Sequence, residues 1–148
     1  MAAKFIIEAD GGSRGNPGPA AYGTVVRRAD TGEVLVEKAG YLGETTNNVA
    51  EYTGLLEGLA LAFELDADAE VEARLDSKLV VEQMSGRWKI KNDALRKLAI
   101  EGQGIARGKS VTYTWVPREQ NKAADALVNE LLDSRGSGSD ELEILRRF

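Results

Sequence analysis

Four acidic residues stand where a folded chain could bring them into one site. Asp10 and Asp76 each follow a run of strand-forming residues and are expected to close a strand, Glu51 is expected in the first turn of a long helix, and Asp125 in the last helix. Taken singly, Asp76 could cap a helix and Glu51 could favour the positive end of one. Taken together they indicate a site, because neighbouring strands end at one edge of a sheet, where sites of α/β proteins form.

The absence of other catalytic side chains points these acids toward metal chemistry. The sequence holds no His and no Cys, which removes imidazole catalysis, disulfides and thiolate metal sites. Clustered carboxylates repel one another and raise one another's pKa unless a cation compensates them. Hard divalent ions take oxygen ligands, so a cluster of carboxylates without His suits Mg²⁺ or Mn²⁺.

The loop after Asp10, GGSRGNPGP, allows two interpretations. Gly, Asn and Pro between two β-rich runs are ordinary hairpin chemistry. The alternative is a loop whose small residues let a nucleic-acid strand approach the backbone beside a metal ligand. The net charge of −5 counts against nucleic-acid binding, although acids clustered at a metal site would account for part of that excess.

Length and composition describe an ordinary globular chain. Its 148 residues, 43% hydrophobic and 29% charged, suffice for one domain with a sizeable core. The apolar run near the N-terminus is too short for a signal peptide, and no stretch approaches a membrane span. We therefore expect no membrane partner, and the lack of Cys favours a cytoplasmic location.

The elements that must position the acids follow from hydrophobic periodicity. Strands at 4–9, 20–28 and 33–41, joined by short connections, predict an antiparallel meander. The further predicted elements are a helix within 45–65, a strand at 71–75, helices at 77–86 and 92–108, a strand at 110–116 and a helix at 121–134. Gly102 and Gly104 are expected to interrupt the helix at 92–108. This order predicts a mixed sheet covered by helices.

The C-terminal segment, residues 134–148, is predicted to lie outside the catalytic domain at 1–133. It begins as a flexible Gly/Ser linker. Leu142, Leu145 and Phe148 then follow at intervals of three, so the end of the chain is expected either to dock as a helical turn or to form a disordered tail. The linker composition also suggests fusion to another domain in a longer parent protein.

Over residues 3–133 the sequence resembles the type 1 ribonuclease H family. The matching motifs are DGGSRGNPGPA at Asp10, TTNNVAEYTGLLEGL at Glu51, LDSKLVVEQMSG at Asp76, WKIKN at 88–92 and NKAADALVNE at Asp125. The resemblance implies a five-stranded mixed sheet, its first three strands antiparallel, flanked by helices. It also implies an endonuclease that hydrolyses the RNA strand of RNA–DNA hybrids and leaves 5′-phosphate and 3′-hydroxyl ends, and we expect it to be a monomer.

The resemblance also assigns roles to the four acids. It implies that Asp10, Glu51 and Asp76 hold two Mg²⁺ ions, with Asp10 bridging them and Mn²⁺ as a possible substitute, and that Asp125 completes the site. Two such ions can activate a water and stabilise the leaving 3′-oxygen in an in-line displacement. This chemistry would explain how a chain without His acts as a nuclease.

Further residues match the family's contacts with nucleic acid. The resemblance places Gly12, Ser13 and Asn16 along the RNA strand, where the 2′-hydroxyl distinguishes RNA from DNA. It places Asn47 and Asn48 between the strands in the minor groove, and it assigns Thr46 and Asn92 to a pocket for a DNA phosphate. Helix capping and turn formation are an alternative explanation for these polar residues, and one residue can both cap and bind.

The sequence departs from the commoner family pattern in two places. The loop VPREQNKAAD lacks the His that many members carry there. Arg118 is the candidate to replace this His, as in a branch of the family. The alternative is that Arg118 is only a solvated surface charge. The long basic helix and loop of well-known members is also absent, leaving only SGRWKIKN. Trp88 in that segment could stack near the DNA strand or belong to the core, so both alternatives stay open.

Two rival functions remain compatible with these motifs. One is a nuclease of the same fold that cuts another substrate: the TTNN segment and the GGSRGNPGP loop argue against duplex DNA, whereas cleavage of duplex RNA stays open. The other is a module that binds hybrids without cleaving them, although all four acids are present.

Overall fold

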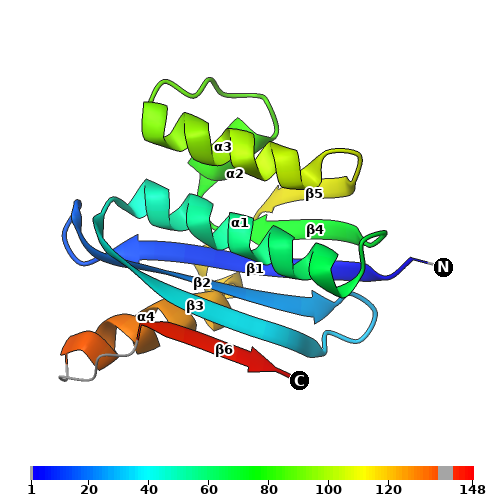
Figure 1. The fold of residues 1–148 in the computed structure, drawn as a ribbon, viewed down its shortest axis with the longest axis horizontal. Coiled ribbons are helices and arrows are strands. Elements are labelled where there is room, and N and C mark those ends of the chain that lie inside the picture. Colours follow the sequence, from blue (N-terminus) through cyan, green and yellow to red (C-terminus); the bar gives the residue numbers. More distant parts are fainter. Residues whose placement is uncertain (1, 137–141) are drawn as a thin grey trace.

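The structure, a computed structural model, describes residues 2–136 and 142–148. Its core is one six-stranded sheet in the order β5-β4-β1-β2-β3-β6 (Figure 1). The elements are β1 (Lys4–Ser13), β2 (Gly18–Arg28), β3 (Val34–Thr45), α1 (Asn47–Leu65), β4 (Glu70–Leu75), α2 (Lys78–Met84), α3 (Asp93–Ala106), β5 (Ser110–Trp115), the short 3₁₀ helix η1 (Arg118–Gln120), α4 (Lys122–Gly136) and β6 (Glu143–Arg147).

The sheet is mixed, as predicted. Strands β1, β2 and β3 pair antiparallel, whereas β4 runs parallel to β1 and β5 parallel to β4. Strand β1 is longer than the sequence suggested, because its ladder with β2 continues past Asp10, which pairs with Gly23, as far as Ser13, which pairs with Ala20. Asp10 therefore lies inside its strand, and the prediction that it closes the strand is wrong.

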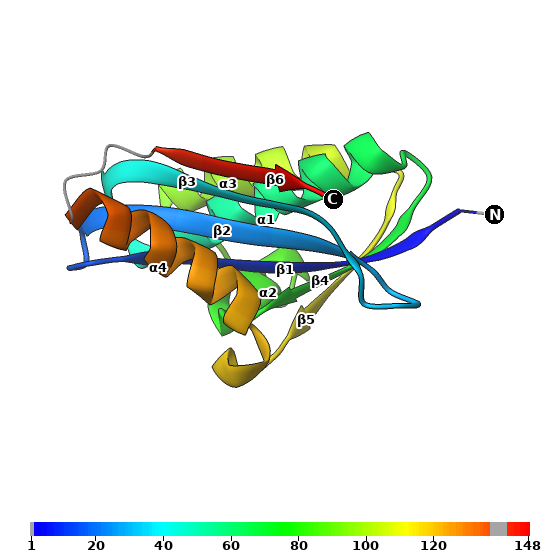
Figure 2. The ribbon, with the colours of Figure 1, turned by 90° about the horizontal axis from the view of Figure 1, so that it is seen from below.

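The helices cover both faces of the sheet. Of the helices in the described residues, α1, α2 and α3 lie on one face and α4 lies on the other (Figure 1 and Figure 2). The larger core cluster fills the first face and includes Ile7, Tyr52 and Leu55, all fully buried. A smaller cluster under α4 gathers Val25, Leu131 and their neighbours.

Glycines let α1 approach β1 closely at the level of Asp10. A Cβ on Gly11 would lie 2.2 Å from the backbone carbon of Ala50, and a Cβ on Gly54 would lie 2.6 Å from the carbonyl oxygen of Asp10. Side chains at these two positions would therefore push the helix away from the strand. The close approach places Glu51, which follows Ala50, directly over β1.

Helix α3 is continuous through both of its glycines, so the predicted interruption is wrong. A Cβ on Gly102 would lie 3.1 Å from Leu56 Cδ1 and 3.2 Å from Met84 Cε. The glycine thus serves tight packing of α3 against α1 and α2. Gly104 faces open space, and its cost to the helix, about 1 kcal/mol relative to Ala, is tolerated.

The C-terminal segment adds a sixth strand where the sequence suggested a helical turn or a disordered tail. Strand β6 pairs antiparallel with β3, from Val36 opposite Arg147 to Gly40 opposite Glu143. The reason is non-local: without β6, the edge of β3 would present unpaired backbone groups that a further strand can satisfy. The buried side chain of Ile144 joins the cluster under α4, so the end of the chain packs against the sheet as a strand and not as a helical turn.

The boundary between domain and tail is less sharp than predicted. Helix α4 continues to Gly136, so residues 134–136 belong to the helix, and the rest of the expected linker, 137–141, lies outside the described residues. The division into a catalytic domain at 1–133 and a tail stays a prediction. Within the described part of the chain no helix is long and apolar enough to cross a membrane, and the cytoplasmic location stays a prediction.

Candidate active site

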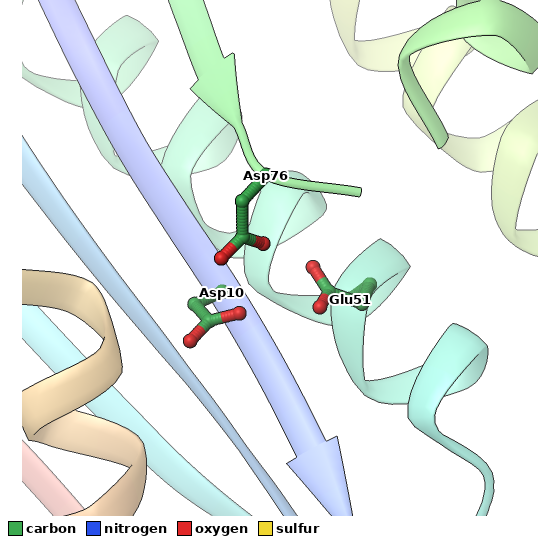
Figure 3. A group of neighbouring side chains, drawn as sticks. All are labelled: Asp10, Glu51 and Asp76. Carbon is green, nitrogen blue, oxygen red and sulfur yellow. The ribbon is translucent and has the colours of Figure 1, made fainter. Parts of the chain in front are cut away.

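Three of the four acids meet at one point on the sheet. Asp10 comes from β1, Asp76 directly follows β4, and Glu51 projects from α1, with their carboxylates turned toward one another (Figure 3). One oxygen from each lies within 4.8 Å of the others. Because β1 and β4 are parallel and Ala9 pairs with Leu75, the two aspartates that follow stand at the same level. Glu51 is the fifth residue of α1, so it lies in the second turn and not in the first.

Burial and mutual repulsion disfavour ionisation of this cluster. Asp10 is buried, and its burial, together with the charge of Asp76, raises its pKa to about 7. The pKa of Glu51 is raised by burial and then by the charges of Asp10 and Asp76, and the pKa of Asp76 is raised chiefly by burial. Glu51 Oε2 is buried and, among the described residues, meets no hydrogen-bond donor.

These observations fit a bound divalent cation. The donors are carboxylate oxygens only, which suits the hard ions Mg²⁺ and Mn²⁺. A buried carboxylate oxygen without a donor is costly unless something positive compensates it. A cation among the three carboxylates would relieve the repulsion that raises their pKa values. Asp10, Glu51 and Asp76 are therefore the residues that would hold it.

Asp125 and Arg118 stand beside this cluster as a pair. Asp125 lies in the first turn of α4, and its Oδ1 is 3.5 Å from Arg118 Nη2. Asn129, one turn further along the helix, donates from Nδ2 to Asp125 Oδ2 at 3.3 Å. The charge of Asp125 contributes to the raised pKa of Asp10, and the positive charge of Arg118 lowers that of Asp76, so both act on the cluster electrostatically.

A cleft of about 630 Å³ opens over the acids. Its lining includes three residues that the sequence suggested for nucleic-acid binding, Gly12, Ser13 and Asn47. The lining does not include the other five residues suggested for nucleic-acid binding, Asn16, Thr46, Asn48, Trp88 and Asn92. The residues that line the cleft are Asp10, Gly11, Gly12, Ser13, Arg14, Asn47, Glu51, Asp76, Trp115, Arg118, Asp125, Val128, Asn129 and Leu132.

The end of β1 and the loop after it are tied to the start of α1 by asparagine side chains. Asn47 Oδ1 accepts hydrogen bonds from the Ser13 backbone N–H at 2.8 Å and from Ser13 Oγ at 3.1 Å. Asn16 Oδ1 accepts from the Asn47 N–H at 3.0 Å. Thr46 caps α1 by accepting from Val49 N–H, whereas Asn48 is exposed. The hairpin interpretation is thus correct, and it leaves the loop facing the cleft.

The segment between α2 and α3 carries the last two candidates. Asn92 caps α3, its Oδ1 accepting from Leu95 N–H at 3.1 Å. Trp88 is 45% exposed, which rules out a place in the core. Gln83 anchors this segment, because its Nε2 donates to the Lys89 carbonyl at 3.3 Å. Its Oε1 in turn accepts a buried hydrogen bond from Tyr52 Oη at 2.7 Å.

Trp115 and Arg14 are among the cleft residues that the sequence did not suggest. Trp115, at the end of β5, donates from Nε1 to the Asp76 carbonyl at 3.2 Å and so touches the backbone of a cluster acid. Its place at the end of the strand that follows the Asp76 strand could have indicated this. Arg14 lies in the quoted loop, but its partner, Asp133 on α4, is 119 positions away, and no local signal predicts that pairing.

Comparisons with known proteins agree with this geometry. A family model described as "Reverse transcriptase-like" matches residues 8–131. The chain is 54% identical over 132 residues to the bifunctional protein Rv2228c of Mycobacterium tuberculosis, covering 88% of this chain but 36% of that protein. It is 42% identical over 125 residues to ribonuclease HI of Halobacterium salinarum, covering 84% of this chain and 62% of that protein.

Solved structures show the same likeness. The N-terminal RNase H domain of Rv2228c superimposes with a TM-score of 0.88 at 51% identity, covering 93% of this chain and 99% of that one. LC11-RNase H1, solved in complex with an RNA/DNA hybrid, gives a TM-score of 0.84 at 42% identity, covering 89% and 99%.

Sheet order, helices on both faces and an acidic cluster at the β1–β4 level define a ribonuclease H-like fold. With the sequence relatives added, the chain belongs to the type 1 ribonuclease H family. Its sheet has six strands where the family resemblance implied five.

Proposed function

We propose that the chain is a metal-dependent endonuclease that hydrolyses the RNA strand of RNA–DNA hybrids and leaves 5′-phosphate and 3′-hydroxyl ends. The observation that carries the proposal is the set of three carboxylates within 4.8 Å, one with a buried oxygen that meets no donor among the described residues, at the base of a cleft. Relatives named ribonuclease HI, and a related structure bound to an RNA/DNA hybrid, support the choice of substrate.

In this proposal the acids serve as ligands for metal ions. Asp10, Glu51 and Asp76 would hold two Mg²⁺ ions, or Mn²⁺ in their place, and Asp125 would complete the site from α4. Bound there, the ions would supply Lewis-acid stabilisation of phosphate charge and a lowered pKa for the attacking water. The rigid positions of the acids on β1, β4 and the packed α1 keep the carboxylates aligned before substrate arrives, which lowers the cost of ordering them.

The remaining residues would position the nucleic acid. Gly12 and Ser13 face the cleft and would contact the RNA strand, with Asn47 holding Ser13 in place. Arg118 would offer fixed hydrogen-bond donors and a positive charge to the phosphate beside Asp125. Asn16 and Asn48 would contact the hybrid from outside the cleft, and Thr46, Asn92 and exposed Trp88 would contact the DNA strand. A monomeric state and fusion to a further domain stay predictions.

One assay tests the proposal. Labelled RNA–DNA hybrid, duplex DNA and duplex RNA are each incubated with the protein and Mg²⁺, Mn²⁺ or a chelator, with Asp10→Asn as the control for a contaminating nuclease. We expect cleavage of the RNA strand of the hybrid, only with metal and only by the unaltered protein. Preferred cleavage of either duplex would assign a different nuclease activity, and binding without cleavage would assign a non-catalytic module.

A further inference from the structure

A second arginine lines the active-site cleft and has no part in the proposed chemistry. Arg14 follows Ser13 in the loop after β1, and its backbone N–H donates to the Pro19 carbonyl at 2.9 Å. Its guanidinium crosses to α4 and pairs with Asp133. The loop and the helix are thus linked by charge on one side of the cleft.

Arg14 and Arg118 both pair with aspartates of α4, and both line the cleft that holds the acids. Arg118 pairs with Asp125 in the first turn of α4, and Arg14 pairs with Asp133, eight residues later, which corresponds to about 12 Å along a helix axis. Among the described residues that line the cleft, these arginines are the two cations, and Asp10, Glu51, Asp76 and Asp125 are the acids. A polyanion that enters an acidic cleft needs cationic contacts on its flanks.

The pairing with Asp133 is suited to exchange. The Arg14 side chain is 48% exposed and that of Asp133 is 69% exposed, and exposed ion pairs contribute little to stability. Breaking the pair therefore costs little. A phosphate accepts from the planar guanidinium in the same two-pronged way as a carboxylate, so it can take the place of Asp133 without moving the arginine far.

We propose that Arg14 binds a backbone phosphate of the nucleic acid in the cleft, and that Asp133 competes with this phosphate for the guanidinium in the free protein. The proposal rests on the proposed function, since it assigns a contact to the same substrate. Before the nucleic acid binds, Asp133 keeps the Arg14 side chain along the cleft wall. Because the Arg14–Asp133 pair must break when the phosphate binds, the net affinity for the phosphate is lowered by the energy of that pair.

The first test is hybrid binding by the Arg14→Ala variant, measured in an Asp10→Asn background so that the hybrid stays intact. We expect the dissociation constant to rise about tenfold at low salt, and the slope of log affinity against log salt to fall by about one. Arg28→Ala is the matched control, because Arg28 pairs with Asp30 and their side chains have similar exposed fractions, 51% and 66%. Arg28 is the last residue of β2 and lies opposite Phe5, near the start of β1 and away from the loop with Arg14. Equal effects of the two substitutions on affinity would overturn the proposal.

The second test addresses the competition by Asp133. Asp133→Asn should tighten hybrid binding about two- to threefold, and it should have no effect once Arg14 is Ala, because contacting residues in one network are not additive. Asp30→Asn is the matched control and should leave binding unchanged. The same tightening by Asp133→Asn with and without Arg14 would overturn the exchange.

The two proposals fail separately. A wild-type protein that does not cleave hybrids would contradict the proposed function. A wild-type protein that cleaves hybrids, but whose KM and salt dependence are unchanged by Arg14→Ala, would contradict the Arg14 contact alone. Thermal melting of each variant shows whether the fold is kept, and Arg14→Lys, which retains the charge without the planar fork, should recover part of the lost affinity.

Discussion

Asn121 donates a hydrogen bond from Nδ2 to the backbone carbonyl of Ala9 at 2.8 Å, across 112 positions of the chain. The asparagine is fully buried. Its own backbone N–H donates to the Arg118 carbonyl, and its carbonyl accepts from Asp125 N–H. Asn121 thus joins the residue before Asp10, through its side chain, to Arg118 and to the helix with Asp125, through its backbone. The fourth acid is positioned through this contact.

Replacing Asn121 by Ala should therefore affect both stability and rate. The change leaves the Ala9 carbonyl without its donor, and we expect the free energy of unfolding to fall by about 1–3 kcal/mol. Asp125 and Arg118 would lose their anchor, so kcat should fall while KM for the hybrid changes less than threefold. Urea denaturation and steady-state kinetics measure the two effects. A stability loss with unchanged kcat would reduce Asn121 to a structural residue.

The acidic cluster should make stability depend on pH when no metal is present. Asp10 has a pKa near 7 in the folded protein against about 3.9 when unfolded, so the folded state binds more protons between these values. The free energy of unfolding should therefore fall as pH rises from about 4 to 7. Glu51 and Asp76, whose pKa values are also raised, act in the same direction.

Denaturant titrations with a chelator at pH 5 and pH 8 measure this dependence. We expect a loss of more than about 1.4 kcal/mol at the higher pH, the value of one pKa unit. Asp10→Asn should flatten the dependence and abolish turnover, since the neutral amide no longer repels its neighbours or compensates a cation. Added Mg²⁺ should restore wild-type stability at pH 8 but have less effect on Asp10→Asn. A pH-independent stability in chelator would show that burial and mutual repulsion do not raise the pKa values of these three acids.

Much of this arrangement was predictable from the sequence, because it follows local patterns. The alternation in 71–75 and the apolar spacing in 45–65 placed the elements that carry Asp76 and Glu51, and the order of strands brought them to Asp10. The length of β1 was underestimated because an acid followed by glycines is typical of a turn. In the folded chain the ladder with β2 outweighs that preference as far as Ser13.

The features that escaped prediction depend on contacts between distant segments. The spacing of Leu142, Leu145 and Phe148 is helical, but the open edge of β3 determines the strand conformation. From the sequence alone Gly102 predicts a break in the helix. In the structure Leu56 and Met84 pack closely against it, which explains why a glycine is accommodated within a continuous helix. Periodicity describes a segment alone, whereas these outcomes are determined by the surface that each segment meets.

Strand β6 offers a direct test of the docked tail. Ile144 is buried in the cluster under α4, whereas the next residue, Leu145, is exposed. Ile144→Ala should lower the free energy of unfolding by about 2–4 kcal/mol, and Leu145→Ala, the matched control, should change it by less than about 0.5 kcal/mol. Equal, small effects in urea denaturation would indicate that β6 does not pack stably in solution.

Asn92 combines a capping role with its predicted contact to a DNA phosphate, and two substitutions separate these roles. Asn92→Ala should cost about 1 kcal/mol of stability through loss of the α3 cap and should raise KM more than it lowers kcat. Asn92→Asp keeps a capping oxygen but replaces the amide donor by a negative charge. It should keep the stability and raise KM at least as much as Ala. A normal KM for Asn92→Asp would remove the phosphate role, and the same kinetic comparison applies to Thr46.

Arg118 tests whether a fixed charge replaces the His of the commoner family pattern. Its guanidinium stands 3.5 Å from Asp125 and is largely exposed, so it can reach a phosphate in the cleft. Loss of one electrostatic donor lowers kcat by roughly 10- to 1000-fold, and we expect a value in this range for Arg118→Ala with little change in hybrid binding. Because Arg does not titrate near neutral pH, the wild-type profile of kcat against pH should show no limb that disappears in Arg118→Ala. Arg118→His should introduce such a limb, since imidazole titrates in this range. An Arg118→Ala enzyme with undiminished kcat would make the residue a surface charge that serves only its pair with Asp125.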